Sequence, residues 1–225
     1  MKISCLIPAY NEESRITNVL NTVTKHPLID EVIVVNDAST DATVEKIKFF
    51  KNVTLIEHKD NKGKSNAIYT GLQASQGEYI LFVDADLVGL SEQDITNLIN
   101  PVISGQADIA ISLRGNTPLL WRLIGLDYIS GERVLPRRII MEHAHKIPAL
   151  PGFGLEVFLN RILIKNKCRI KVIKWDNVHS PYKKGGYGIF KDIKGNIHMA
   201  IEVLKNISIW EALRQIKSML NLKVK

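Results

Sequence analysis

The chain has 225 residues, 45% of them hydrophobic and 24% charged, which is ordinary for a globular domain and argues against a mainly disordered chain. Residues 1–110 carry 9 Lys and Arg against 15 Asp and Glu, whereas residues 111–225 carry 21 against 8, so the net charge of +7 hides an acidic half and a basic half. The acidic half would repel a polyanion, and the chain has no helix-turn-helix signature, so nucleic-acid binding is not expected.

No apolar run approaches the roughly 18 to 20 residues that a membrane span requires. Cys5 and Cys168 fall in separate predicted strands, and two cysteines without a signal peptide are typical of a reducing compartment. We therefore expect a cytoplasmic protein. The basic half suits phosphates, an anionic acceptor or the inner face of a membrane, although a solvated surface explains any single Lys as well.

In the first hundred residues, short β-branched apolar runs alternate with helical patterns, which predicts βαβ units and a largely parallel sheet. The predicted strands are residues 3–7, 31–35, 53–57, 79–83 and 109–113. The predicted helices between them are residues 12–25, 41–50, 65–75 and 91–103, the last with Ser91 and Asp94 as a cap. Ligands of such sheets bind beyond the carboxyl ends of the strands.

Beyond residue 114 the pattern is looser. It predicts a helix near residues 155–165, a strand near 169–174, a loop rich in Lys and Gly at 181–188, and helices at 189–205 and 207–222. In the last helix, apolar side chains fall on one stripe; these are Ile209, Trp210, Leu213, Ile216 and Leu220. Such a helix either lies in the headgroup region of a membrane or packs its stripe on its own domain, and the second is the commoner arrangement.

Asp84 and Asp86 bracket a single residue directly after a predicted strand. Two neighbouring carboxylates are costly to bury unless a cation neutralises them, and Mn²⁺ or Mg²⁺ takes carboxylate and phosphate oxygens together. One ion could thus bridge the protein to a diphosphate. An Asp-x-Asp also occurs as a solvated turn or a helix cap, so the pair needs support from its surroundings.

That support comes from three more segments that follow strands or open a helix: IPAYNEE at residues 7–13, VNDASTD at 35–41 and NKGKSNA at 61–67. In this order before an Asp-x-Asp, they resemble glycosyltransferase family 2 over about the first 115 residues. The resemblance implies an α/β domain of GT-A type, Rossmann-like with a mostly parallel sheet. It implies a donor-binding half at residues 1–115, an acceptor half at 116–188 and a helical C-terminal extension at 189–225.

The resemblance also implies roles for single residues. Pro8, Ala9, Tyr10 and Glu12 would line the nucleoside pocket, Asp37 would accept from the base, Lys64 would lie near the nucleotide, Asp84 and Ala85 would approach the ribose, and Asp86, with Asp84, would bind the metal. Each residue has a plainer alternative, because Pro8 could end a strand, Asp37 could cap a helix and Gly63 could start a turn. The Gly63-Lys64-Ser65 segment is half of a phosphate-loop pattern, but position 58 is His where that pattern requires Gly.

Further along, Ser112-Leu113-Arg114 and Ser130-Gly131-Glu132-Arg133 resemble the SR and SGFR stretches of polyprenyl-phosphate mannose synthases within that family. By this resemblance, Arg114 and Arg133 face phosphates, for which a planar guanidinium is suited, and a surface salt bridge is the alternative. The Leu87-Val88-Gly89 segment departs from the polar residues that those synthases have after the Asp-x-Asp.

Two later residues complete the predicted site. Glu156 opens a helix after a glycine-rich turn, where the family places an acidic residue as a general base or a positioning group; the helix dipole alone also favours it there. His179 follows the last predicted strand and is a candidate third metal ligand beside Asp84 and Asp86, although a lone loop His is more often a surface residue.

These observations predict a metal-dependent, inverting hexosyltransferase that uses a UDP- or GDP-linked sugar, with Asp86 and Glu156 as its catalytic residues. The acceptor is not identified by the sequence. A polyprenyl-phosphate sugar synthase at the membrane surface is the alternative within the same class. A non-catalytic protein that binds a nucleotide sugar or a polyanion is the alternative from another class, and it would need no intact Asp-x-Asp.

Overall fold

A seven-stranded sheet forms the centre of the protein in the computed structural model, which describes residues 1–180, 201 and 203–224. The strands run in the order β3-β2-β1-β4-β6-β5-β7. They are β1 (Ile3–Ala9), β2 (Glu31–Asn36), β3 (Val53–Glu57), β4 (Tyr79–Phe82), β5 (Ile109–Arg114), β6 (Arg133–Pro136) and β7 (Ile170–Trp175). Every neighbouring pair is parallel except that β6 runs antiparallel to both β4 and β5.

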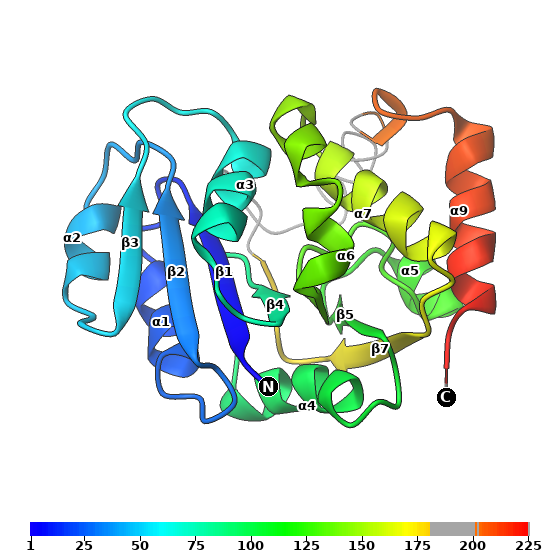
Figure 1. The fold of residues 1–225 in the computed structure, drawn as a ribbon, viewed down its shortest axis with the longest axis horizontal. Coiled ribbons are helices and arrows are strands. Elements are labelled where there is room, and N and C mark those ends of the chain that lie inside the picture. The colour runs from blue at the N-terminus through cyan, green and yellow to red at the C-terminus, as the bar shows by residue number, and fades with distance from the viewer. Residues whose placement is uncertain (181–200, 202, 225) are drawn as a thin grey trace.

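Helices cover both faces of this sheet, giving three layers (Figure 1). One face packs against α1 (Ile16–Val23), α2 (Thr43–Lys48) and α4 (Glu92–Ile103). The other packs against α3 (Lys64–Ala74), α6 (Arg137–Met141), the 3-10 helix η1 (Ala144–Ala149), α7 (Gly154–Lys165) and α9 (Ile209–Asn221). The short helix α5 (Leu119–Ile124) follows β5 and buries none of its own residues.

The alternating direction of the side chains along each strand explains why the sheet has a hydrophobic core on each face. In β1, Leu6 packs in one core, whereas its neighbours Cys5 and Ile7 pack in the other, because successive side chains of a strand point to opposite faces. Both faces are covered, so the strand reads as a continuous apolar run rather than an alternating one.

The elements predicted for the first 115 residues are confirmed, with ends that differ by a few residues. Ser91 caps α4 in a reciprocal capping box with Asp94, as the sequence indicates. The later helix at α7 and the strand at β7 are confirmed as well. The expectation that both cysteines lie in strands holds for Cys5 only: Cys168 is buried but precedes β7.

The antiparallel strand β6 was not predicted, nor were α5, α6 and η1. The helix predicted at residues 189–205 and the boundary at 188/189 fall largely outside the described residues, as does the loop at 181–188. The last predicted helix is α9, and it packs on the main domain rather than standing apart.

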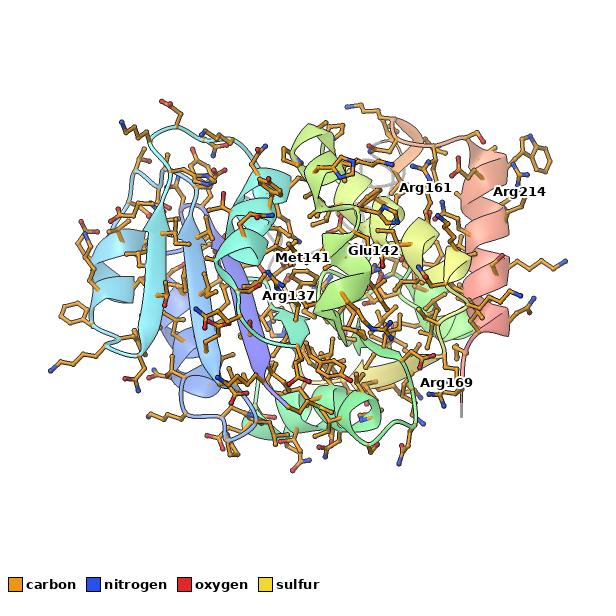
Figure 2. All side chains as sticks on the ribbon, in the orientation of Figure 1. Arg137, Met141, Glu142, Arg161, Arg169 and Arg214 are labelled. Carbon is orange, nitrogen blue, oxygen red and sulfur yellow. The ribbon has the colours of Figure 1, made fainter. Side chains whose placement is uncertain are left out.

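Three contacts fix α9 in place. Arg161 on α7 forms an ion pair with Glu211 across 2.7 Å, and Figure 2 shows Arg161 beside α9. Tyr128 donates a hydrogen bond to Gln215 at 2.8 Å inside the core. Past the helix, Lys223 donates to the carbonyl of Gly125 at the end of α5, at 2.9 Å. No helix in the described part of the chain is both long and apolar enough to cross a membrane.

Candidate functional site

The carboxyl ends of β1, β2, β4 and β5 meet at one edge of the sheet, and a cleft of about 490 Å³ opens there. Its walls bring together residues from the separate segments that the sequence singles out. Lining it are Pro8, Ala9, Tyr10, Glu12, Asp37, Asn61, Gly63, Lys64, Ala67, Asp84, Ala85, Asp86, Arg114, Phe153 and Ser180. A larger hollow of about 810 Å³ lies between α4 and β7, but among its lining residues only Lys174 is charged. We therefore take the strand-end cleft as the candidate site.

Asp84 and Asp86 line this cleft and follow closely after β4. Lys64, the first residue of α3, forms an ion pair with Asp84 at 2.8 Å, and Ser180 donates a hydrogen bond to Asp86 at 2.9 Å. Burial raises the pKa of Asp86 to about 6, and the negative charge of Asp84 adds to the rise. A pair of carboxylates whose negative charge is poorly solvated suits a divalent cation, which would remove this repulsion. The donor set thus fits Mn²⁺ or Mg²⁺ chemically.

The third proposed ligand, His179, is held close to this pair by its backbone. Val88 and His179 exchange two backbone hydrogen bonds, of 2.9 and 3.0 Å. Gly89 and Gly115 make the approach possible, because a Cβ on either would lie only 2.3 Å from the carbonyl of Asn177 or 2.1 Å from that of Asp176. The segment Leu87-Val88-Gly89, which follows the Asp-x-Asp, therefore pairs with the loop that carries His179.

The full metal site is nevertheless not assembled. Within the described ranges, no group of three or more His, Cys, Asp or Glu side chains is arranged to hold a metal ion. Asp84, Asp86 and His179 come from adjoining segments, but the Asp84 carboxylate is engaged with Lys64. Metal binding through all three would require these side chains to rearrange.

Asp37, at the end of β2, organises the loop that leads into α3. Its carboxylate accepts hydrogen bonds from the backbone N–H groups of Lys62 and Gly63, at 3.0 and 2.7 Å, and from Nδ1 of His58 at 2.7 Å. The other ring nitrogen of His58 lies 2.8 Å from the Thr70 hydroxyl. Asp37 thus anchors the loop beside the cleft, and it does not cap the helix after β2, which was the plainer alternative.

Glu156 lies in the first turn of α7 but does not line the open cleft. It is 3% exposed, and its Oε1 contacts Lys64 at 3.3 Å, while its Oε2 is buried with no hydrogen-bond partner in the described structure. Lys64 therefore sits between Glu156 and Asp84. Burial alone would lower the pKa of Lys64, but these two carboxylates raise it, so the ammonium stays charged. Gly131 leaves room for this arrangement, since a Cβ there would lie 2.9 Å from both Asp84 and Lys64.

The two arginines that were expected to face phosphates have different environments. Arg114 lines the cleft and pairs with Glu132 at 3.2 Å, so it is part of a buried network and not a surface salt bridge. Arg133 corrects the prediction: the residue is 1% exposed, and its guanidinium donates to the carbonyls of Ser130 and Tyr128 and to Asn160. These partners hold Arg133 in the interior, and it is not among the residues that line the cleft.

Three residues that bond directly to predicted site residues were not predicted. Glu132, Ser180 and His58 bond directly to Arg114, Asp86 and Asp37, respectively. The sequence could have indicated Glu132, because this carboxylate directly precedes the apolar run of β6 and would need a buried partner there. The other two carry no pattern that the sequence alone could have distinguished.

Known proteins with similar sequences are glycosyltransferases. The family described as Glycosyl transferase family 2 matches residues 4–151. Among curated proteins, the chain is 36% identical over 164 residues to the glycosyltransferase GlyA of Streptococcus pneumoniae, covering 68% of this chain and 23% of that protein. It is also 36% identical over 102 residues to the 4,4'-diaponeurosporenoate glycosyltransferase of Staphylococcus aureus, covering 44% of this chain and 27% of that protein. The match spans only about a quarter of these relatives' length.

Among solved structures, glucosyl-3-phosphoglycerate synthase from Mycobacterium tuberculosis is similar in fold. Its complex with Mn²⁺, UDP and glucosyl-3-phosphoglycerate gives a TM-score of 0.69 at 20% identity, over 92% of this chain and 80% of that one. Its complex with Mg²⁺ and UDP gives 0.68 at 21% identity, over 92% and 80%. At this identity the likeness shows a shared GT-A architecture. Since the family pattern also covers most of the sequence, this chain belongs to glycosyltransferase family 2.

Proposed function

We propose that this chain is the donor-binding domain of a metal-dependent, inverting glycosyltransferase that takes a hexose from a UDP- or GDP-linked donor. The observation that carries the proposal is the acidic pair at the cleft, where the pKa of Asp86 is raised to about 6 beside Asp84. Asp37 and its anchored loop lie in the same cleft, within the residues expected to meet the nucleoside.

Asp86 and Asp84 would hold the divalent ion, with His179 as the third ligand. An ion bound there would supply positive charge to the diphosphate as it leaves. Arg114 and Lys64, which also line the cleft, contribute permanent positive charge. In an inverting transfer, the acceptor oxygen forms a bond to the anomeric carbon as the bond from that carbon to the diphosphate breaks on the opposite side.

The chemistry of the acceptor decides whether a base is required. A hydroxyl acceptor must lose a proton, and Glu156 could take it only if Lys64 moves aside, because Glu156 is buried behind that ammonium. A phosphate acceptor already carries negative charge and needs no base. The Lys64–Glu156 contact thus favours an acceptor that is already ionised, with Glu156 acting to position Lys64.

The test is donor turnover with each nucleotide sugar. We would measure release of UDP or GDP from the linked hexose, with Mn²⁺ and with EDTA, for the wild type, Asp86→Ala and the exposed control Asp60→Asn. The account predicts turnover only with the metal and a loss of at least about 100-fold in Asp86→Ala, since removal of a metal ligand should cost no less than removal of its supporting groups. Undiminished, metal-independent turnover in Asp86→Ala would refute the proposal. Metal-independent nucleotide binding without turnover would support the non-catalytic alternative.

A second candidate, a polyprenyl-phosphate sugar synthase that acts at a membrane surface, is favoured by exposed apolar side chains. On α5, Leu119, Leu120 and Leu123 are 68%, 61% and 75% exposed. On α9, Trp210 and Leu213 are exposed too, although Ile216 and Leu220 pack against the core. The apolar stripe of α9, for which the sequence left both membrane contact and packing on the domain open, is therefore divided between a packed part and an exposed part.

Basic residues accompany both apolar surfaces. Arg122 is exposed on α5, and Arg214 lies on the outer side of α9 in Figure 2. Leucines and Trp that enter the headgroup region, flanked by cations on anionic lipid, form a peripheral contact of the kind that we propose here.

Vesicle co-sedimentation tests this candidate. Wild type should sediment with anionic vesicles and not with zwitterionic ones, and Leu120→Ser with Leu123→Ser should abolish sedimentation while donor turnover in solution persists. If the wild type stays in the supernatant at low salt, the membrane proposal fails and a soluble acceptor is favoured.

A further inference from the structure

Glu132 is a fully buried carboxylate at the entrance to β6. Its Oε2 accepts hydrogen bonds from the hydroxyls of Ser112, at 2.8 Å, and Ser130, at 3.1 Å, and its Oε1 accepts from Nη1 of Arg114 at 3.2 Å. Burying a carboxylate is costly unless it is paired and hydrogen-bonded, and these three donors meet that requirement. An apolar side chain of similar volume would fill this space without that cost.

The hydrogen bonds continue from Glu132 to the acidic pair. Nη1 of Arg114 also donates to the Ser180 hydroxyl at 2.7 Å, and that hydroxyl donates to Asp86 at 2.9 Å. Glu132 before β6, Arg114 at the end of β5, Ser180 after β7 and Asp86 after β4 are thus joined by consecutive hydrogen bonds. The last of these side chains, Asp86, is one of the residues that we propose to bind the metal.

Among these four hydrogen-bonded side chains, Arg114 has an N–H group that makes no hydrogen bond within the described residues. Its Nε is buried and has no hydrogen-bond partner within the described residues, yet Arg114 lines the cleft. Although burial would lower its pKa, the carboxylates around it, Glu132 foremost, raise the pKa above its ordinary value, so Arg114 stays cationic. Phosphate oxygens are suitable acceptors for a guanidinium N–H that has no partner, because the planar guanidinium presents its N–H groups in fixed directions.

We infer that Glu132 is a positioning residue for donor binding: it holds Arg114 in the orientation in which the guanidinium meets the diphosphate, and through Ser180 it sets the orientation of Asp86. This inference rests on the proposed function. It predicts that loss of the Glu132 charge weakens recognition of the diphosphate and leaves recognition of the nucleoside unchanged, because Asp37 and its loop lie elsewhere in the cleft.

The experiment compares UDP with uridine, and GDP with guanosine, by calorimetric titration in Mn²⁺. Glu132→Gln should weaken nucleoside-diphosphate binding about tenfold, a magnitude usual for groups that orient ligand-binding residues, with nucleoside affinity unchanged. Ser112→Ala is the matched control: it removes a hydrogen bond from the same carboxylate but keeps the Glu132–Arg114 pair, so the ratio of the two affinities should stay as in the wild type. In an Arg114→Ala background, Glu132→Gln should have no further effect, because Glu132 acts through Arg114.

Three results would overturn the inference: unchanged UDP or GDP affinity in Glu132→Gln, an equal loss of nucleoside and nucleoside-diphosphate affinity, or a loss that persists in the Arg114→Ala background. If Glu132→Gln does not fold, Arg114→Lys replaces it, and an unchanged affinity ratio in that variant overturns the inference as well. In each of these cases the wild type still binds the diphosphate and the proposed function stands. A wild type that binds neither UDP nor GDP would instead remove the proposed function, and the inference with it.

Discussion

Replacing Asp86 by Asn is expected to stabilise the metal-free protein at neutral pH. Burial raises the pKa of Asp86 to about 6, with Asp84 as the second cause. When the folded pKa of an acid lies above its unfolded value, the stability tied to that group is complete below the unfolded pKa and is lost as the pH rises through the folded one. Ionised Asp86 therefore destabilises the fold above about pH 6. Asn removes that charge and can still accept the hydrogen bond from Ser180.

The magnitude follows from the shift. The ordinary pKa is 3.8 and the folded pKa is about 6, which corresponds to about 3 kcal/mol at about pH 7.5. At about pH 4.5 the folded carboxyl already carries its proton, and the difference falls to about 1 kcal/mol. Because Asp84 relaxes when its neighbour loses its charge, about 3 kcal/mol is an upper bound for the gain in the free energy of unfolding.

Urea unfolding in EDTA measures this gain, with fluorescence of the fully buried Trp175 as the reporter. Asp108→Asn is the control of opposite sign, because a hydrogen bond from Arg169 lowers the pKa of Asp108. That carboxylate stabilises the fold above its ordinary pKa, and its replacement should cost stability at neutral pH. If Asp86→Asn leaves the free energy of unfolding unchanged at neutral pH, or if its gain is as large at about pH 4.5, the electrostatic reasoning is wrong.

Three further changes probe other parts of the cleft. Asp37→Ala should raise the donor KM more than it lowers kcat, since in the proposed function the loop that it anchors would contact the nucleotide equally in the ground and transition states; an unchanged KM would count against this. Gly89→Ala should weaken Mn²⁺ affinity, because Gly89 has a φ of +81° and an added Cβ would displace the loop carrying His179; full affinity would show that this loop is not part of the metal site. His179→Ala should weaken Mn²⁺ binding while leaving the metal-free melting temperature nearly unchanged, and identical metal titration curves would return His179 to a surface role.

The fold of the first 115 residues could be predicted because each local pattern there specifies one element. Strands such as β1 read as continuous apolar runs, and polar segments at their carboxyl ends indicated where a cleft would open. By contrast, β6 is only four residues long and begins with Arg133, whose partner Asn160 lies 27 residues away in the sequence. No local pattern can reveal such a pairing, so both the antiparallel strand and the inward direction of Arg133 were missed.

The packed face of α9 was predicted only in part: Ile216 and Leu220 pack against the core, but Trp210 and Leu213 are exposed. Hydrophobicity placed Trp210 and Leu213 on the packed stripe, yet the helix buries Gln215 and Met219. A buried Gln is stable there because Tyr128 donates a hydrogen bond to it. This polar contact joins the apolar contacts of Ile216 and Met219 in holding that face inward, and its partner lies 87 residues away in the sequence.

The most direct test of the central claim is calorimetric titration of the wild type and Asp86→Asn with UDP and with GDP, each with Mn²⁺ and with EDTA. The account predicts that the wild type binds one of the two nucleotides tightly only with Mn²⁺, and that Asp86→Asn, although folded and more stable without metal, loses this dependence and binds weakly in both conditions. Equal affinity of the wild type with and without Mn²⁺, or full Mn²⁺-dependent affinity in Asp86→Asn, would contradict the assignment of the acidic pair as the metal-binding residues of a nucleotide-sugar cleft.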